Sequence, residues 1–154
     1  MTASTPPKAS SPEVSKRMKR VRRRDTGPEL RLRSELHRQG LRFRVDVPVP
    51  FLPRHRADVV FGPAKVAVFV DGCFWHGCPI HGEVPRSNSA WWKAKIERVR
   101  QRDARTDDAF RAQGWLVVRV WEHEDVSAAA DRVQRTVEAR QPVSPVSKRL
   151  APAR

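Results

Sequence analysis

The pattern of apolar and polar positions along the chain predicts an α/β protein with a mixed sheet. Alternating or continuously apolar segments predict strands at 42–47, 56–61, 65–70 and 115–121. Helical spacing of apolar residues, with start and stop signals, predicts helices at 12–24, 26–40, 88–113 and 125–140. The strand at 65–70 is the most apolar and is expected at the centre of the sheet. This order of elements is typical of a mixed β-sheet with helices on its faces.

Local signals support several of these boundaries. Ser11 is expected to cap the first helix, and Thr26 with Glu29 has the spacing of a capping box at the second. The Gly-Pro turn between the strands at 56–61 and 65–70 favours a hairpin. At 100° per residue, six residues of the long helix lie within about 40° of one common direction and so form one face: Trp92, Ile96, Val99, Asp103, Thr106 and Phe110.

The charge of the chain points to a polyanionic partner. Its 154 residues include 31 Lys and Arg against 17 Asp and Glu, a formal net charge of +14 at pH 7. This excess favours nucleic acid as the partner, with solubility alone as the alternative interpretation. No apolar run has the length of a bilayer span, and the order of a signal peptide is missing. We therefore expect a cytoplasmic, nucleoid-associated protein without a membrane partner.

The two ends of the chain differ in composition from the rest. Residues 1–12 and the basic segment 141–154 are rich in Pro, Ser and Ala, and both predict disordered tails around one domain at 13–140. The first helix of that domain has a narrow apolar face, formed by Met18 and Val21. A helix against DNA phosphates fits this pattern, and a solvated helix is the alternative. Its candidate DNA contacts include Met18, Lys19, Arg20 and Arg24.

Both cysteines of the chain lie in the sequence GCFWHGCPIH. Two thiolates and two imidazoles are the usual ligands of a tetrahedral structural zinc ion. Cys73, Cys78 and His81 are close in sequence, and either His76 or the distant His123 would be the fourth ligand. Buried thiols without a metal are the alternative.

Three carboxylates could form a second metal site. Asp58 lies within an apolar strand and Asp71 directly follows another, and a carboxylate in such a place needs an ion partner. With Glu29 on the preceding helix, they could hold Mg²⁺ through oxygen ligands, as phosphodiester hydrolysis requires. The alternative is that Asp58 forms an ion pair with Arg56 or Arg54 at a sheet edge.

The loop that carries the cysteines also contains groups suited to act on DNA. His76 could serve as a general acid or base, unless it ligates zinc. Its neighbours Phe74 and Trp75, with Trp91 or Trp92, could stack on bases or wedge between them. A role in the hydrophobic core is the alternative for these aromatic side chains.

Together these residues resemble the very short patch repair (Vsr) endonucleases, a zinc-containing branch of the restriction-endonuclease-like PD-(D/E)xK superfamily. The most specific segment of the resemblance is GCFWH at 72–76. The other matching segments are MK at 18–19, RDT at 24–26 with Glu29, GLRFR at 40–44, RAD at 56–58, Trp92, KI at 95–96, RD at 102–103, GW at 114–115 and VWE at 120–122.

The resemblance implies a Mg²⁺-dependent nickase that cuts 5′ of the mispaired T in T:G mismatches left by deamination of 5-methylcytosine. Asp58 would be the catalytic carboxylate that binds the metal, and the backbone carbonyl of Val70 a further ligand. His76 would be the general acid or base, and Glu29 would support the site through water or His76.

The resemblance also implies a structural zinc site and a set of intercalating side chains. The zinc ligands would be Cys73, Cys78, His81 and His123, which leaves His76 for chemistry. The side chains beside the mismatch would be Phe74, Trp75 and Trp92, with Met18 entering from the other groove. A monomer is expected, and mismatch-repair proteins such as MutL are the implied partners.

The chain departs from the family pattern at a position that matters for catalysis. Asp71 stands where the family often has His, so a possible proton donor is lost, while the carboxylate could supply a second metal ligand. Two smaller departures are Ala57 before Asp58 and His123 in the place of a cysteine. Asp71 favours the alternative of a non-catalytic, zinc-stabilised DNA-binding module. A nuclease of the same fold that acts on other DNA is the third hypothesis.

Overall fold

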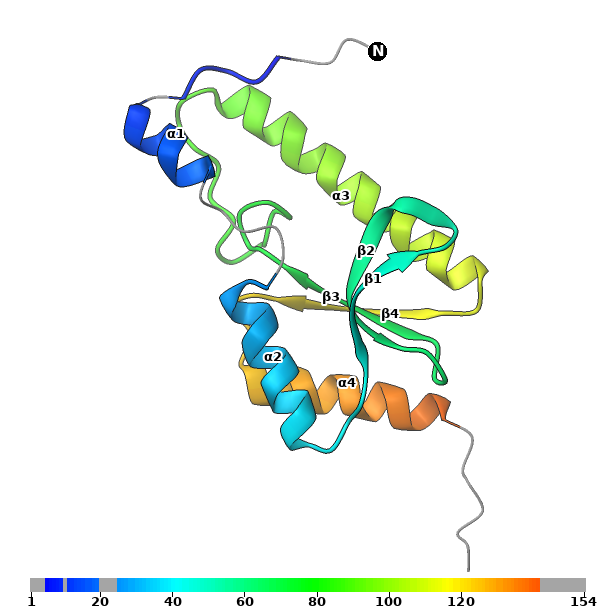
Figure 1. The fold of residues 1–154 in the computed structure, drawn as a ribbon. Helices are drawn as coiled ribbons and strands as arrows, with labels where there is room; N and C mark the ends of the chain where they lie inside the picture. Colours follow the sequence, from blue (N-terminus) through cyan, green and yellow to red (C-terminus); the bar gives the residue numbers. More distant parts are fainter. Residues whose placement is uncertain (1–4, 10, 20–24, 142–154) are drawn as a thin grey trace, which may run out of the picture.

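The computed structural model describes residues 5–9, 11–19 and 25–141. Figure 1 shows a mixed α/β architecture with helices on both faces of one sheet, so the predicted mixed sheet flanked by helices and the predicted order of elements are confirmed. The elements are α1 (Pro12–Lys19), α2 (Gly27–Arg38), β1 (Arg44–Val49), β2 (Leu52–Phe61), β3 (Val66–Asp71), α3 (Ser89–Ala112), β4 (Leu116–Trp121) and α4 (Val126–Arg140).

The sheet has the strand order β1-β2-β3-β4. Its first two pairings are antiparallel, and β3 pairs with β4 in parallel. The predicted hairpin between β2 and β3 is confirmed, with Val59 opposite Val68 and Phe61 opposite Val66. The apolar strand β3 is an inner strand, as its composition predicts, because it has a neighbour on each side.

A second hairpin joins β1 to β2, and the sequence pattern did not predict it. β1 and β2 are separated by two residues and close with Val49 opposite Leu52, whereas the predicted strands at 42–47 and 56–61 left a long loop. Prolines in this region argue against a strand, because proline cannot donate to a ladder. β1 is an edge strand, where Pro48 is tolerated beside a register shift.

Helices cover both faces of the sheet (Figure 1). On one face, α2 and α4 pack against β2, β3 and β4 through a core that contains Leu32, Leu36, Val59, Val68, Val120 and Val133. On the other face, α3 contributes Phe110 to a smaller core with Ala57, Val60 and Ala67. Val66, Ala67 and Val68 of β3 are fully buried, as a strand covered on both faces requires.

The helix starts follow the predicted signals in one case and depart from them in another. The side chain of Ser11 caps α1 by accepting the N–H of Val14 at 3.2 Å, as predicted. The predicted capping box at α2 is wrong, because the Thr26 side chain makes no cap hydrogen bond. The Glu29 carboxylate instead accepts the N–H of Asp25 at 2.9 Å and pairs with Arg33 at 3.2 Å. The ion pair one turn later draws Glu29 away from the box geometry.

The apolar face predicted for the long helix is confirmed in α3. Ile96, Thr106 and Phe110 are buried, and Trp92 and Asp103 on the same face are half-buried. This face is directed toward the sheet, so it brings a carboxylate of α3 to the edge where β3 and β4 end.

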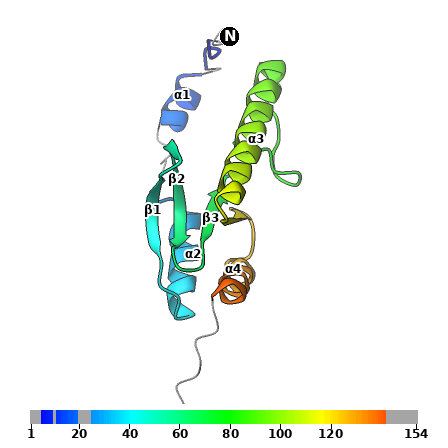
Figure 2. The ribbon, with the colours of Figure 1, turned by 90° about the vertical axis from the view of Figure 1, so that its right-hand side faces the viewer.

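Figures 1 and 2 place α1 and the first turns of α3 at the same end of the molecule. The predicted DNA contacts Arg20 and Arg24 lie outside the described residues, as do 142–154 of the predicted basic tail. Met18 and Lys19 belong to the last turn of α1, and their side chains are likewise outside the description. In the described part of the chain, no helix combines the length and apolar character that crossing a membrane requires.

Candidate active site and metal centre

The parallel pairing of β3 with β4 assembles the candidate site. In parallel strands the carboxyl ends meet at one edge of the sheet. Asp71 is paired with Trp121 in the register, so the residues that follow each strand leave the sheet side by side. Cys73 and His123 each lie two positions beyond this pair, and the structure places the Cys73 Sγ 3.1 Å from the His123 Nδ1. The strand register therefore joins two segments that lie 50 residues apart.

The loop after β3 is wound tightly by its own backbone hydrogen bonds. The N–H of His76 bonds to the carbonyl of Gly72 at 3.1 Å, and the N–H of Cys78 bonds to the carbonyl of Cys73 at 2.8 Å. Gly77 has φ of +65°, and a Cβ there would lie 2.6 Å from the Cγ2 atom of Ile96. The loop therefore needs glycine at this position both for its backbone conformation and for its contact with α3.

Two cysteines and two histidines converge beyond β3 and β4. The ligand atoms of Cys73, Cys78, His81 and His123 all lie within 4.8 Å of one another. The Cys78 Sγ is 3.5 Å from the His123 Nδ1, and the rings of His81 and His123 are 4.5 Å apart. His76 is outside this group, so of the two candidate fourth members it is His123 that joins the thiols. We call these four residues the thiol cluster.

The two thiols of this cluster have different environments. Burial raises the pKa of Cys73 to about 11, and the adjacent Cys78 thiol adds to this effect. At Cys78 burial acts in the same direction, but hydrogen bonds from the backbone of His81 and Ile80 outweigh it and lower the pKa. Backbone N–H groups directed at a sulfur stabilise a thiolate, the form that binds metals.

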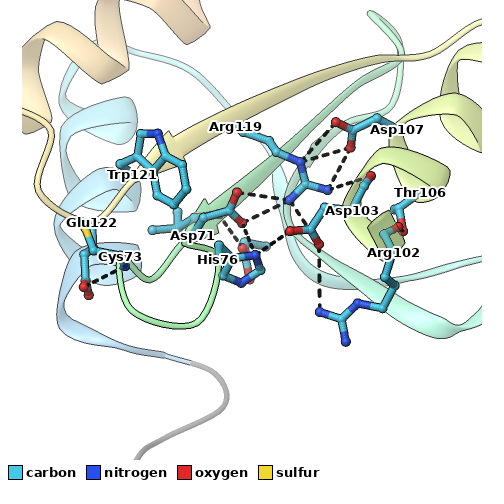
Figure 3. A network of polar contacts seen from close by, with 12 residues as sticks. Asp71, Cys73, His76, Arg102, Asp103, Thr106, Asp107, Arg119, Trp121 and Glu122 are labelled. Carbon is cyan, nitrogen blue, oxygen red and sulfur yellow. Dashed lines mark hydrogen bonds and ion pairs between the residues drawn. The ribbon is translucent and has the colours of Figure 1, made fainter. Parts of the chain in front are cut away.

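His76 belongs to a different group, drawn in Figure 3. Its Nδ1 is 2.6 Å from the Asp103 Oδ2 and 3.7 Å from the Asp71 Oδ1. Asp71 also accepts from Arg119 of β4, whose Nη1 is 3.0 and 3.2 Å from the two carboxylate oxygens. Arg119 reaches Asp107 of α3 as well, at 2.7 Å. We call these five residues the acidic network.

Burial and charge act in opposite directions within the acidic network. Burial raises the pKa of Asp71 above its ordinary value, although the charges of Arg119 and His76 oppose this. At Asp103 burial also acts to raise the pKa, but the hydrogen bond with His76 and the nearby positive charges outweigh it and lower the pKa. Asp103 is therefore a stable carboxylate that orients the His76 ring through Nδ1, leaving Nε2 as the nitrogen available for external chemistry.

Asp58 lies where β2 and β3 separate. The paired residues of the two strands extend only as far as Val59 and Val68, and beyond this point the Asp58 Oδ2 accepts the N–H of Val70 at 2.7 Å. The carbonyl of Asp71 accepts the N–H of Glu122, directly after β4, at 3.0 Å. Because neighbouring residues of a strand direct their backbone groups to opposite sides, the carbonyl of Val70 faces β2 and Asp58. The carboxylate and this carbonyl therefore share the opening between the strands.

Acidic neighbours make the Asp58 position unfavourable for a lone negative charge. Burial raises the pKa of Asp58 to about 7, and the charges of Glu29 and Asp71 contribute to the increase. The alternative of an ion pair with Arg56 is wrong, because Arg56 binds Asp46 at 2.7 Å instead. A divalent cation would suit this position, because it would stabilise the ionised carboxylates that burial and mutual repulsion otherwise disfavour.

The aromatic candidates form one continuous group. Phe74 and Trp75 of the loop lie 5.2 and 5.9 Å from Trp92 of α3, measured between ring centroids. Trp91 contacts Trp92 at 4.8 Å, and the Lys95 ammonium lies 5.4 Å from the Trp91 ring. The four rings are half-buried. They present a shared apolar surface from two elements.

Three members of the acidic network were not recognised as site residues from the sequence: Asp103, Asp107 and Arg119. A signal was present for each. Asp103 interrupts the apolar face of the long helix, Asp107 follows one turn later, and Arg119 interrupts an apolar strand. A charged residue on a buried face requires a partner, and Arg119 is a partner of both aspartates.

Comparison with known proteins identifies the family. The family model described as DNA mismatch endonuclease Vsr matches residues 9–81. The nicking enzyme V.NaeI of Lentzea aerocolonigenes is 43% identical over 129 residues, which cover 80% of this chain and 75% of the relative. The chain belongs to the Vsr family. The DNA mismatch endonuclease Vsr of Escherichia coli is 39% identical over 111 residues, covering 70% of this chain and 68% of that enzyme.

A further relative extends the match over most of its own length. The nicking enzyme V.XorIIP of Xanthomonas oryzae is 40% identical over 126 residues, which cover 79% of this chain and 89% of the relative. The chain is thus a Vsr-family DNA endonuclease, a hydrolase whose partner is DNA.

Proposed function

We propose that this Vsr-family endonuclease nicks one DNA strand 5′ of the mispaired T in T:G mismatches, by Mg²⁺-dependent hydrolysis. The observation that supports the proposal is that a candidate metal-binding carboxylate and a candidate general acid or base lie at the same end of strand β3. The carboxylate is the half-buried Asp58 beside the Val70 backbone, and the acid or base is His76 held by Asp103. Family membership supplies the substrate class, and the mismatch is the specific part of the proposal.

Asp58 and the carbonyl of Val70 would hold the magnesium ion. The residues fit such an ion, because oxygen donors lie together where burial, with the charges of Glu29 and Asp71, raises the pKa of Asp58, and a cation would stabilise the ionised carboxylate. Glu29 supports the position through its charge and is itself held by Arg33. When bound, the ion would lower the pKa of a coordinated water and neutralise charge on the phosphate.

His76 would act as the general acid or base. Its Nδ1 is bound to Asp103, which fixes the ring and the tautomer and directs Nε2 away from the network. A positioned imidazole can take a proton from the attacking water or give one to the leaving oxygen. The ring side chain is about one-fifth exposed at 19%, so DNA can reach it.

The thiol cluster would hold a structural zinc ion. Zinc ligands at about 2.3 Å for sulfur and about 2.0 Å for nitrogen lie roughly 3.5 Å apart in a tetrahedron. The distances from the His123 Nδ1 to the two sulfur atoms, 3.1 and 3.5 Å, are close to that separation. Because the loop that joins Cys73 to Cys78 also carries His76, the ion would keep the general acid or base in place.

The aromatic group would recognise the mismatch by inserting between bases. Phe74, Trp75 and Trp92 would enter one groove, and Met18 on α1 would enter the other. A mismatch is more weakly stacked than a paired step, so a wedge costs less there. Basic residues near the start of α3, together with Lys19, Arg20 and Arg24, would bind the phosphates.

The test is nicking of end-labelled duplexes that contain one T:G mismatch, with matched duplexes and the Asp58→Ala protein beside them. We expect a Mg²⁺-dependent cut 5′ of the T in the mismatched duplex alone, and no cut by Asp58→Ala, which still binds DNA. Mismatch binding without any cut would support the non-catalytic module. Cutting that ignores the mismatch would support a nuclease for other DNA.

A further inference from the structure

Arg119 occupies a position in the strand where an apolar residue is expected. It lies between Val118 and Val120, which are buried in the core under α2 and α4, so its side chain is on the opposite face, toward α3. There its guanidinium carbon is 4.7 Å from the centre of the Phe69 ring. The side chain is only 21% exposed. A positive charge in such a place is stable only with fixed negative partners.

Those partners come from two other elements, as Figure 3 shows. The Nη1 of Arg119 binds both oxygens of Asp71 at the end of β3, and its Nε and Nη2 bind Asp107 of α3. Nη2 also lies 3.4 Å from the backbone carbonyl of Asp103, and Nη1 lies 3.8 Å from its carboxylate. Arg119 therefore ties β3, β4 and α3 together at the residue that orients His76.

Two carboxylates compete for the same nitrogen of His76. Asp103 is 2.6 Å from Nδ1 and Asp71 is 3.7 Å from it. A guanidinium that binds both Asp71 oxygens holds that carboxylate away from the ring, so Asp103 remains the partner of Nδ1. The same nitrogen takes one lone-pair site on each Asp71 oxygen and places a positive charge directly beside the carboxylate, so a second cation on those oxygens is disfavoured.

We propose that Arg119 is a positioning residue for His76, and that Asp71 is the counter-ion of Arg119 rather than a ligand of the catalytic metal. The guanidinium places a fixed positive charge among the carboxylates of Asp71, Asp103 and Asp107. Its N–H donors lie in one plane and bind several carboxylates at once in fixed positions, which a lysine ammonium group cannot do. This inference rests on the proposed function, because it assigns the orientation of the residue that would transfer the proton.

The first experiment compares Arg119→Lys and Arg119→Ala with a matched control, Arg111→Ala. Arg111 also pairs with an aspartate of α3, Asp108, but both side chains are 72% exposed. The single-turnover nicking rate of both Arg119 variants is expected to fall about 10- to 100-fold, as misplacement of a catalytic group does, with DNA affinity within about twofold of the wild type. Arg111→Ala is expected to keep the wild-type rate.

Chemical rescue separates positioning from a general loss of stability. Methylguanidinium is expected to restore part of the rate of Arg119→Ala and to leave Arg111→Ala unchanged. If Arg119→Ala does not fold, Arg119→Lys provides the test, because lysine keeps the positive charge but lacks the planar set of N–H donors. A wild-type rate for Arg119→Lys, or a folded Arg119→Ala that methylguanidinium does not rescue, would overturn the proposal.

The second experiment tests Asp71 directly through its substitution Asp71→Asn. As a counter-ion, Asp71 should affect the nicking rate while the Mg²⁺ concentration for half-maximal rate stays within about threefold of the wild type. A tenfold or larger increase in that concentration, as roughly expected when a ligand is lost, would make Asp71 a metal ligand. Nicking that survives in both Asp58→Ala and His76→Ala would reject the proposed function itself. Loss of nicking in those two variants with a wild-type rate in Arg119→Lys would reject only the role of Arg119.

Discussion

The thiol cluster and the acidic network share one loop, yet they are built for different tasks. His76 and Cys78 are two positions apart. The ligand atoms of the thiol cluster lie within 4.8 Å of one another, and so do those of Asp71, His76 and Asp103 in the acidic network. The thiol cluster consists of neutral or anionic donors that suit a soft cation. The acidic network already contains the positive charge of Arg119 against Asp71. Convergence of donors alone therefore does not identify a metal site, because the charge already present decides whether a cation is needed.

The comparison predicts that substitutions on the two sides of this loop have separate effects. His76→Ala should lower the nicking rate by about 10²- to 10⁴-fold, the range for a general acid or base, and should leave bound zinc at the wild-type level. Nicking assays and metal analysis of the same sample test this. Loss of zinc together with activity would show that the two centres are not independent.

The largest effect on stability is expected at the thiol cluster. Removing zinc with a strong chelator, or the change Cys73→Ser, should lower the Tm by about 10 °C or more, because structural zinc contributes directly to folding. Thermal unfolding followed by circular dichroism measures the change. His76→Ala is the control, and its Tm should differ little from that of the wild type. An unchanged Tm after complete zinc removal would contradict the structural role.

The raised pKa of Asp58 predicts a pH dependence on the acidic side of the loop. Nicking at low Mg²⁺ should increase roughly tenfold between about pH 6 and pH 8, because only the ionised carboxylate binds the cation. More Mg²⁺ should move the midpoint to lower pH. A rate that is constant over this range would argue against Asp58 as a metal ligand.

The same shift has a consequence for stability in the absence of Mg²⁺. The folded protein holds the Asp58 proton up to about pH 7, whereas the unfolded chain releases it near its ordinary value of about 4. The free energy of unfolding should therefore fall as pH rises through this window. Asp58→Asn should lack this component of the pH dependence in denaturant titrations, and an identical dependence in both proteins would contradict the raised pKa of Asp58.

A smaller effect, on zinc affinity, is expected at Glu122, which supports the thiol cluster through the Cys73 backbone. The Glu122 Oε1 accepts the N–H of Cys73 at 2.9 Å and so helps to orient the first thiol. Glu122→Gln should weaken zinc binding by about tenfold, in line with other groups that support metal ligands, and leave the nicking rate of the zinc-loaded protein unchanged. Competition with a chromogenic chelator measures the affinity. A reduced nicking rate of Glu122→Gln at full zinc occupancy would instead assign Glu122 a role in catalysis.

The elements of this fold were predictable because their signals are local. The apolar run of β3 and the single face of α3 follow from periodicity, and both are confirmed. The β1–β2 hairpin was missed because its prolines suppress the strand signal, although an edge strand tolerates them. The capping box at Thr26 was wrong because an ion pair with Arg33 competes for Glu29.

The sequence by itself determined the family resemblance, the order of elements and the types of donor available for metals and protons. The resemblance already implied that His123 joins the thiols, but only the tertiary structure decided that the donors are brought together in this way and which partners they have on the catalytic side. It joins His123 to the thiols and His76 to Asp103, and it gives Asp71 to Arg119. The physical reason is that periodicity reports the neighbours of a residue along one element. The partners of these side chains come from strands and helices that are distant in sequence and are set by strand register.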